Sequence, residues 1–145
     1  MIVRSILPIL LLLALAPSCK TELLLGCTNI YGVREILRSS NCVAACGQTA
    51  LCEGDSTRAY GQFVEASWQQ EIGRFRIADF EKMQFELEVV LDTAIRDDLD
   101  DKLARLQGQP IIVKGILGGY DAVTNYACDH QFTLSVQDTA WIQGE

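Results

Sequence analysis

FELEVVLDTAIRDDLDDKLARLQGQPIIVKGIL, residues 85–117, decides the fold, because it places a helix between two strands. Within residues 85–91 one face carries Phe85, Leu87, Val89 and Leu91 and the other carries Glu86 and Glu88, which is the pattern of a half-buried strand. Residues 94–108 carry one apolar stripe at helical spacing, formed by Ile95, Leu99, Leu103 and Leu106. Gly108 predicts the end of this helix, and the apolar run over residues 110–121 predicts the next strand.

Three further strands are predicted around this stretch. Two precede it, over residues 58–68 and 73–80, and one follows it over residues 132–142. Gly61, inside the first of these strands, predicts a bulge or a close bend. Residues 122–130 are expected to form a loop or the end of a hairpin. The order of elements is therefore three strands, a helix and two strands.

The segment before these strands has a different character. Residues 28–40 carry apolar side chains at helical spacing and predict a short amphipathic helix. Residues 41–55 hold three cysteines among small residues and predict a disulfide-pinned loop.

The predicted order of elements resembles that of the OB-fold, a five-stranded Greek-key barrel. GQF at residues 61–63, FRIAD at 75–79 and VKGIL at 113–117 are similar to recurrent strand patterns of OB-fold proteins. The resemblance implies a mainly β domain with one helix between strands three and four, preceded by the short N-terminal helix. A small antiparallel sheet with one helix in another order is the alternative fold.

Three regions follow from this pattern. Residues 1–18 are expected to be a signal peptide. Residues 19–56 are expected to form a lipid tether, the short helix and the cysteine-rich loop. Residues 57–145 are expected to form the OB-like domain.

The first nineteen residues, MIVRSILPILLLLALAPSC, predict an export signal. The apolar run is shorter than the roughly 20 residues that span a bilayer. Cys19 closes this run, whereas Cys27 ends LLGC, which is more similar to the bacterial lipobox. Because two charged residues separate the apolar run from Cys27, we expect lipidation at Cys19, with Cys27 as the alternative. The apolar run could also stay in place as an uncleaved anchor helix or be removed by ordinary signal peptidase.

The sequence CKTELLLG, residues 19–26, resembles the mature start of the inner-ring lipoproteins of type III secretion systems. In that family a lipidated cysteine is followed by Lys, a short residue, an acidic residue and Leu. The resemblance implies an anchor at Cys19. We therefore expect an exported bacterial protein that is held at a membrane by its N-terminal lipid and faces the periplasm. The choice between inner and outer membrane stays open.

Charge and cysteine content narrow the class of protein further. The formal net charge is −7, which argues against a nucleic-acid partner, because such proteins bind by neutralising phosphates. Six cysteines in 145 residues favour disulfides in an oxidising compartment. The disulfide candidates are Cys27, Cys42, Cys46, Cys52 and Cys128.

At least one bridge is expected to join the 42–52 loop to Cys128, because it would anchor that loop to the domain. The number of cysteines leaves the pairing open, since lipidation of Cys19 leaves an odd number. As an alternative, Cys42, Cys46 and Cys52, with Cys128 and His130, offer soft metal ligands.

Six aromatic and basic residues are candidates for a ligand-binding face. OB-folds bind oligosaccharides and oligonucleotides on one face, where aromatic rings can stack on a sugar and arginines can hold an acidic group. The candidates are Tyr60, Trp68, Arg74, Arg76, Tyr120 and Tyr126.

No catalytic group is expected. The single histidine, His130, is predicted to be an exposed loop residue beside Asp129. Ser67 and Ser135 lack the flanking glycines of a nucleophile elbow. Asp97, Asp98, Asp100 and Asp101 form an acidic cluster, but they lack the spacing of a calcium loop and suit a helix start.

The leading hypothesis is a non-catalytic, lipid-anchored binding protein of the envelope without metal or cofactor. Its expected partner is an envelope protein, a peptide or an oligosaccharide. A second hypothesis is an assembly component of an envelope machine such as a secretion system. A third is a thiol- or metal-binding protein that uses Cys42, Cys46 and Cys52.

Overall fold

The computed structural model describes residues 30–39 and 42–144. The predicted signal peptide, Cys19 and Cys27 lie outside the described residues. Within these described ranges, no helix has both the length and the apolar character needed to cross a membrane. The strands are β1 (Ile30–Gly32), β2 (Ser56–Gln69), β3 (Arg74–Ala78), β4 (Glu86–Leu91), β5 (Pro110–Val123), β6 (Cys128–Val136) and β7 (Ile142–Gly144). The α-helices are α1 (Val33–Arg38) and α2 (Asp100–Leu106), and short 3-10 helices lie at Gln70–Ile72, Thr93–Ile95 and Thr139–Trp141.

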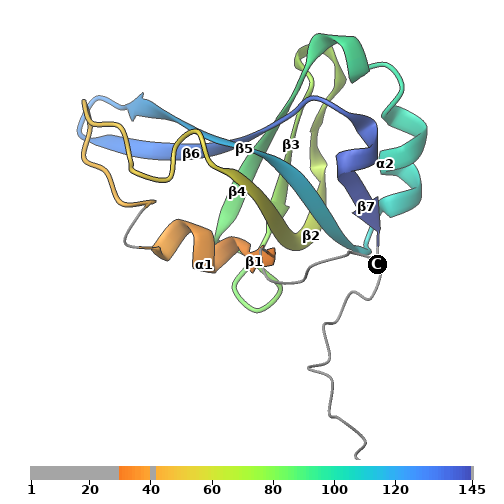
Figure 1. Cartoon of the computed structure of the whole chain (residues 1–145), viewed down its shortest axis with the longest axis horizontal. Helices are drawn as coiled ribbons and strands as arrows, with labels where there is room; N and C mark the ends of the chain where they lie inside the picture. The colour runs from red at the N-terminus through yellow and green to blue at the C-terminus, as the bar shows by residue number, and fades with distance from the viewer. Residues whose placement is uncertain (1–29, 40–41, 145) are drawn as a thin grey trace, which may run out of the picture.

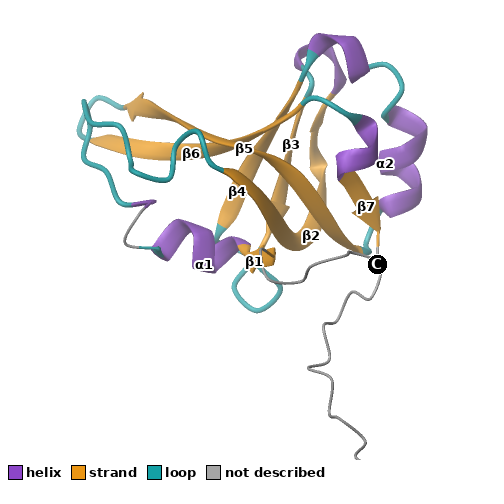
Figure 2. Cartoon of the chain, in the orientation of Figure 1, coloured by secondary structure: helices purple, strands orange, loops and turns teal. Residues whose placement is uncertain are grey.

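The strands form one seven-stranded mixed sheet in the order β1-β2-β3-β4-β6-β5-β7. β2 pairs with β3 and, along its first half, also with β5, so that β2, β3, β4, β6 and β5 follow one another round a partly closed ring (Figure 1). The β1–β2 and β4–β6 pairs are parallel, and the other pairs are antiparallel. The prediction of a mainly β fold is confirmed, and α2 lies between β4 and β5 in the chain (Figure 2).

The core fills the inside of this ring because apolar residues alternate along the strands. In β4 every second residue is buried, as the 85–91 pattern predicts. Phe75, Leu87 and Leu134 come from three different strands and are fully buried. Each such side chain stabilises the fold by about 1.5–3 kcal/mol relative to an exposed one. Gly61 allows β2 and β3 to approach closely, because a Cβ there would lie 2.6 Å from the carbonyl oxygen of Ala78.

The helix predicted over residues 94–108 is shorter than expected. The α2 helix covers Asp100–Leu106, and a 3-10 helix at Thr93–Ile95 precedes it. This 3-10 helix begins where the Asp92 side chain accepts a hydrogen bond from the Ala94 N–H at 2.9 Å. Asp92 thus caps a separate short helix, and residues 96–99 form a turn between it and α2. Of the predicted apolar stripe, Leu99, Leu103 and Leu106 are buried, whereas Ile95 is partly buried and lies in the 3-10 helix.

The predicted start of the N-terminal helix was wrong. Ile30–Gly32 is extended and pairs in parallel with β2, and α1 covers only Val33–Arg38. The Glu35 side chain accepts a hydrogen bond from the Gly32 N–H at 3.1 Å and fixes the transition between the two elements. Sheet pairing thus overrides the local helical period. Val33 and Ile36 pack in the same buried cluster as the strands.

The last predicted strand was also misplaced. β6 runs over Cys128–Val136, four residues earlier than expected, and it ends before a 3-10 helix at Thr139–Trp141. Ile142, the last residue of the predicted strand, begins a separate strand, β7, whereas Trp141 ends the 3-10 helix. As a result, most of the predicted loop over residues 122–130 is hairpin, with a turn over residues 124–127.

Candidate functional site

The β5–β6 hairpin continues beyond the ring. β2 pairs with β5 as far as Ile116, and β4 pairs with β6 from Thr133 onward. We call the projecting residues 118–132 the arm. Residues 42–55, the cysteine loop, run alongside it (Figure 1).

Two disulfides hold the cysteine loop. Cys42–Cys52 closes the loop on itself, and Cys46–Cys128 joins it to the arm. The second bridge confirms the predicted link between the 42–52 loop and Cys128. Two disulfides are consistent with an extracytoplasmic location.

A polar groove of about 340 Å³ separates the arm from the outer face of β3 and β4. We call it the arginine groove. Its lining residues come from β2, β3, β4 and the arm, and they are Ser67, Gln69, Arg74, Phe75, Arg76, Glu86, Glu88, Tyr120, Gln131 and Phe132. Three of the six predicted ligand-face residues therefore meet here, namely Arg74, Arg76 and Tyr120.

Two ion pairs cross the floor of the arginine groove. Arg76 pairs with Glu86, and the Arg74 Nη1 lies 3.5 Å from a Glu88 carboxylate oxygen. Both arginine side chains are about half exposed, so solvent screens these pairs and each contributes little to stability. An incoming carboxylate can therefore compete with a glutamate for either guanidinium. The groove offers charge-assisted donors and acceptors side by side.

Ser67 is hydrogen-bonded through its side chain to the backbone beneath this groove. Its buried hydroxyl accepts a hydrogen bond from the Arg76 N–H at 2.7 Å and donates one to the Val64 carbonyl. The register of β2 against β3 shifts between Val64 and Gln69. Ser67 thus replaces backbone pairing that the irregular strand loses.

The other three ligand-face candidates lie elsewhere. Tyr60 packs its ring against Phe80, with centroids 4.8 Å apart. Trp68 donates its Nε1–H to Asp100 Oδ1 at 2.6 Å and lines a separate groove with Phe63 and residues of α2. Tyr126 lies in the β5–β6 turn and is 98% exposed.

His130 lies on the arm, and its side chain is buried against the cysteine loop. Its side chain is 6% exposed, and both ring nitrogens face carboxylates. Nδ1 lies 2.8 Å from Asp121 Oδ1, and Nε2 lies 2.9 Å from Glu53 Oε1. Each carboxylate also accepts a backbone N–H of the cysteine loop, from Gly47 at 2.8 Å and from Ala50 at 2.7 Å. We call this arrangement of Glu53, His130 and Asp121 the histidine clamp.

Two members of the histidine clamp, His130 and Asp121, each favour the charged form of the other. Hydrogen bonding to Asp121 raises the pKa of His130; burial opposes this shift, and the contact with Glu53 adds to it. The pKa of Asp121 is lowered, first by its hydrogen bond with His130 and then by the Gly47 N–H. Both ring nitrogens have a carboxylate oxygen within hydrogen-bond distance, and an imidazolium can donate to both at once.

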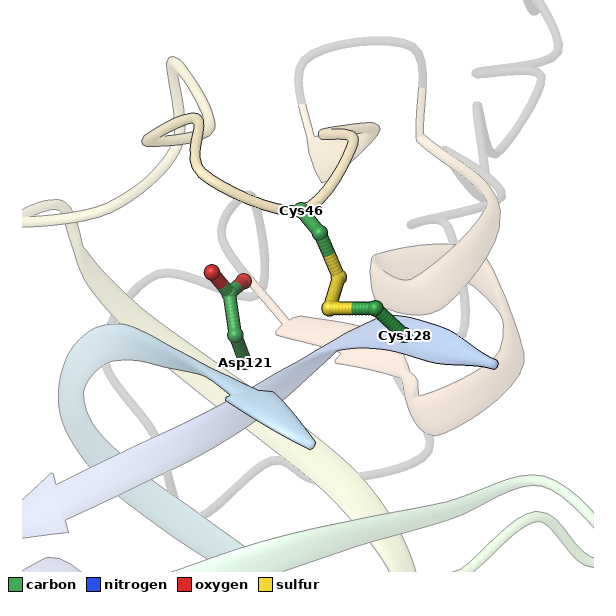
Figure 3. A group of neighbouring side chains, drawn as sticks. All are labelled: Cys46, Asp121 and Cys128. Carbon is green, nitrogen blue, oxygen red and sulfur yellow. A yellow bond between two sulfur atoms is a disulfide. The ribbon is translucent and has the colours of Figure 1, made fainter. Parts of the chain in front are cut away.

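The Asp121 carboxylate also lies beside the Cys46–Cys128 bridge. The two sulfur atoms and a carboxylate oxygen of Asp121 all lie within 4.8 Å of one another (Figure 3). The bridges divide Cys42, Cys46 and Cys52 between two pairs, so in this disulfide-bonded form the three do not offer a set of free thiols.

The histidine clamp was not predicted from the sequence. His130 was expected in an exposed loop beside Asp129, whereas it lies in β6 opposite Asp121 on β5. A turn over residues 124–127 could have been predicted from the sequence. A hairpin closed by that turn pairs residue 121 with residue 130. No local signal indicates Glu53, which is 77 residues away in the chain.

Comparisons with known proteins give little further guidance. No protein-family model matches the chain, and no curated protein matches it. Among solved structures, the chain is similar to a DUF3299 family protein from Pseudomonas aeruginosa PAO1, at 12% sequence identity and a TM-score of 0.40. The alignment covers 65% of this chain and 63% of that chain. Because the sequence identity and the TM-score are both low, this similarity does not indicate a function for the chain.

Proposed function

We propose that this chain is an exported bacterial lipoprotein, anchored through Cys19, whose OB-like domain binds a ligand without chemical conversion. The ligand we infer is an oligosaccharide that bears an acidic group, as fragments of the cell wall do. The observation that carries the proposal is the arginine groove, which joins two guanidinium groups and an aromatic ring over an open sheet face.

The strand connections support an OB-like Greek-key barrel. Counted from β2, the strands of the ring are β2, β3, β4, β5 and β6, with α2 between the third and the fourth. The first strand pairs with the fourth, and the third pairs with the fifth. In OB-folds the face of strands two and three binds oligosaccharides and oligonucleotides. Here that face is the β3–β4 surface, which forms the floor of the arginine groove.

The side chains of the groove suit an acidic sugar. Tyr120 is 45% exposed and presents a ring from the arm, and such rings pack on the apolar faces of sugars. Arg74 and Arg76 can each turn toward a ligand carboxylate, because their present ion pairs are solvent-exposed and weak. The glutamates then accept hydrogen bonds from sugar hydroxyls.

Binding is tested by titrating soluble peptidoglycan fragments into the purified full chain by calorimetry. Tyr120→Ala and Arg76→Gln are each expected to weaken binding by about tenfold or more, which corresponds to about 1.4 kcal/mol. Trp68→Phe is the matched control, because Trp68 lies in a separate groove, and it is expected to leave affinity unchanged. No saturable binding, or a loss of binding only in Trp68→Phe, contradicts the assignment of this groove.

Anchoring is tested separately by mass spectrometry of the mature N-terminal peptide from cells. The expected peptide begins at a diacylated Cys19. An unmodified peptide that contains Cys19 contradicts the anchor at this residue, and a lipidated Cys27 favours the alternative site.

A further inference from the structure

The two bridges of the cysteine loop differ in their access to solvent. Cys42 and Cys52 are each 4% exposed and belong to the core. In contrast, Cys46 is partly exposed and Cys128 is exposed. Thiol–disulfide exchange requires a thiolate to reach a sulfur atom. A reductant therefore reaches Cys46–Cys128 first and leaves Cys42–Cys52 intact.

Opening this bridge does not release the cysteine loop from the arm. The loop stays attached through the histidine clamp and through the Gly47 N–H bond to Asp121. Two backbone hydrogen bonds also join it to β5: Gly54 N–H donates to the Leu117 carbonyl at 2.7 Å, and Leu117 N–H donates to the Asp55 carbonyl at 3.0 Å. The Cys46 and Cys128 thiols therefore stay close together after reduction.

Besides the two cysteine sulfur atoms, the Asp121 carboxylate is a third group that could bind a metal, and its hydrogen bonds fix its orientation. Asp121 lies within 4.8 Å of both sulfur atoms. One of its oxygens accepts the Gly47 N–H and the other faces His130 Nδ1. Hydrogen bonds of this kind fix the orientation of a carboxylate that binds a metal.

We propose that reduction of the Cys46–Cys128 bridge creates a zinc site in which Cys46, Cys128 and Asp121 are the protein ligands. A dithiol reductant passes two electrons and two protons to the bridge and becomes a disulfide itself, and the Sγ–Sγ bond breaks to give two thiols. Zinc then replaces both thiol protons, which are released to solvent.

The ligand set selects the metal. Two thiolates and one carboxylate favour zinc over magnesium or calcium, which prefer oxygen ligands alone. Three protein ligands leave one tetrahedral position for water. The site thus alternates between a covalent bridge in oxidising conditions and a metal bridge in reducing conditions, and both link the cysteine loop to the arm.

The test uses the purified full chain carrying Cys19→Ser and Cys27→Ser, so that only the four bridged cysteines remain. One equivalent of a dithiol is added without oxygen, and the opened bridge is identified by alkylation and peptide mass spectrometry. After removal of the reductant, zinc binding is measured by competition with a chelating dye. Cobalt replaces zinc in a parallel sample, where a thiolate charge-transfer band reports sulfur ligands. We expect one equivalent of metal in the reduced protein and none in the oxidised protein.

Asp121→Asn keeps both cysteines and is expected to weaken zinc binding by about tenfold or more. Asp129→Asn is the matched control, because Asp129 also lies on the arm and its carboxylate accepts a hydrogen bond from the Gln131 side chain. It is expected to leave the affinity unchanged. The proposal is overturned if the dithiol opens Cys42–Cys52 first, if the reduced protein binds no zinc, or if Asp121→Asn binds zinc as tightly as Asp129→Asn does.

Discussion

Gly119→Ala is expected to destabilise the protein through the histidine clamp. Gly119 lies in β5, where a Cβ would overlap His130 Nε2 and lie 3.0 Å from Glu53 Cδ. Neither neighbour is free to move, because His130 also binds Asp121 and Glu53 also accepts the Ala50 N–H. The added methyl group must therefore separate the cysteine loop from the arm.

The size of the effect follows from two opposing contributions. Overpacking a well-packed site costs about 1–3 kcal/mol. Replacing glycine by alanine within a strand returns roughly 0.5–1 kcal/mol by reducing the entropy of the unfolded chain. The difference is a net loss of roughly 0–2.5 kcal/mol, centred on about 1 kcal/mol, in the free energy of unfolding, and a loss of this central size lowers the Tm by roughly 3–6 °C for a domain of this size.

Gly118→Ala is the matched control, because a Cβ at residue 118 would meet only Thr133 Oγ1, at 3.3 Å. Thermal unfolding followed by circular dichroism is measured for both variants near pH 6, and again in a His130→Ala background. Removing the imidazole removes the overlap, so Gly119→Ala is expected to cost less in that background. Equal stability of Gly118→Ala and Gly119→Ala, or an unchanged cost without His130, refutes the geometry of the clamp.

Three further predictions concern the pH dependence of stability, the two disulfides, and the close approach of β2 and β3. The pKa of His130 is raised in the folded protein. The free energy that His130 contributes to stability is therefore complete below its unfolded pKa of about 6.5 and is lost as pH rises through its higher folded pKa. We expect the Tm difference between the wild type and His130→Gln to shrink from pH ~6 toward ~9. Removing a disulfide restores chain entropy to the unfolded state, and the loss of stability grows with the length of the closed loop. Replacing Cys46 and Cys128, which are 82 residues apart, is expected to cost about 4.5 kcal/mol, and replacing Cys42 and Cys52, which are 10 apart, about 2.8 kcal/mol. Urea unfolding of the two double variants checks this order. Gly61→Ala places a Cβ 2.6 Å from the Ala78 carbonyl oxygen, so it is expected to cost about 2 kcal/mol in the same assay, and a neutral result contradicts the close approach of β2 and β3.

The elements that were predicted well are those whose pattern is local. β4 alternates over its whole length, and the apolar stripe of α2 repeats at helical spacing, so both could be identified from neighbours in the chain. β1 could not, because Ile30–Gly32 becomes a strand only by pairing with β2, 28 residues further along the chain. Its apolar residues carry the same spacing as those of α1, and sequence alone does not separate the two.

The candidate site was predicted in part for a similar reason. In an unbroken strand, Tyr60 and Trp68 would share one face, because successive side chains alternate. The register shift between Val64 and Gln69 breaks that relation, and Trp68 instead lines a groove with Phe63. Arg74, Arg76 and Tyr120 do meet, but this depends on where the arm leaves the ring, which is a property of the whole sheet.

The histidine clamp and the arginine groove use opposite faces of the same arm. Asp121 and Gly119 face the cysteine loop, and Tyr120 between them faces the groove, as alternation along a strand requires. An isolated hairpin is marginally stable, so the arm depends on the cysteine loop to stay in place. The clamp and the Cys46–Cys128 bridge therefore hold Tyr120 in position, and for the proposed ligand such preorganisation would raise affinity by reducing the entropy lost on binding. The bridge, the proposed zinc site and the clamp each join the cysteine loop to the arm, so we expect the exchange of bridge for zinc to preserve the groove and the loss of all three to loosen it.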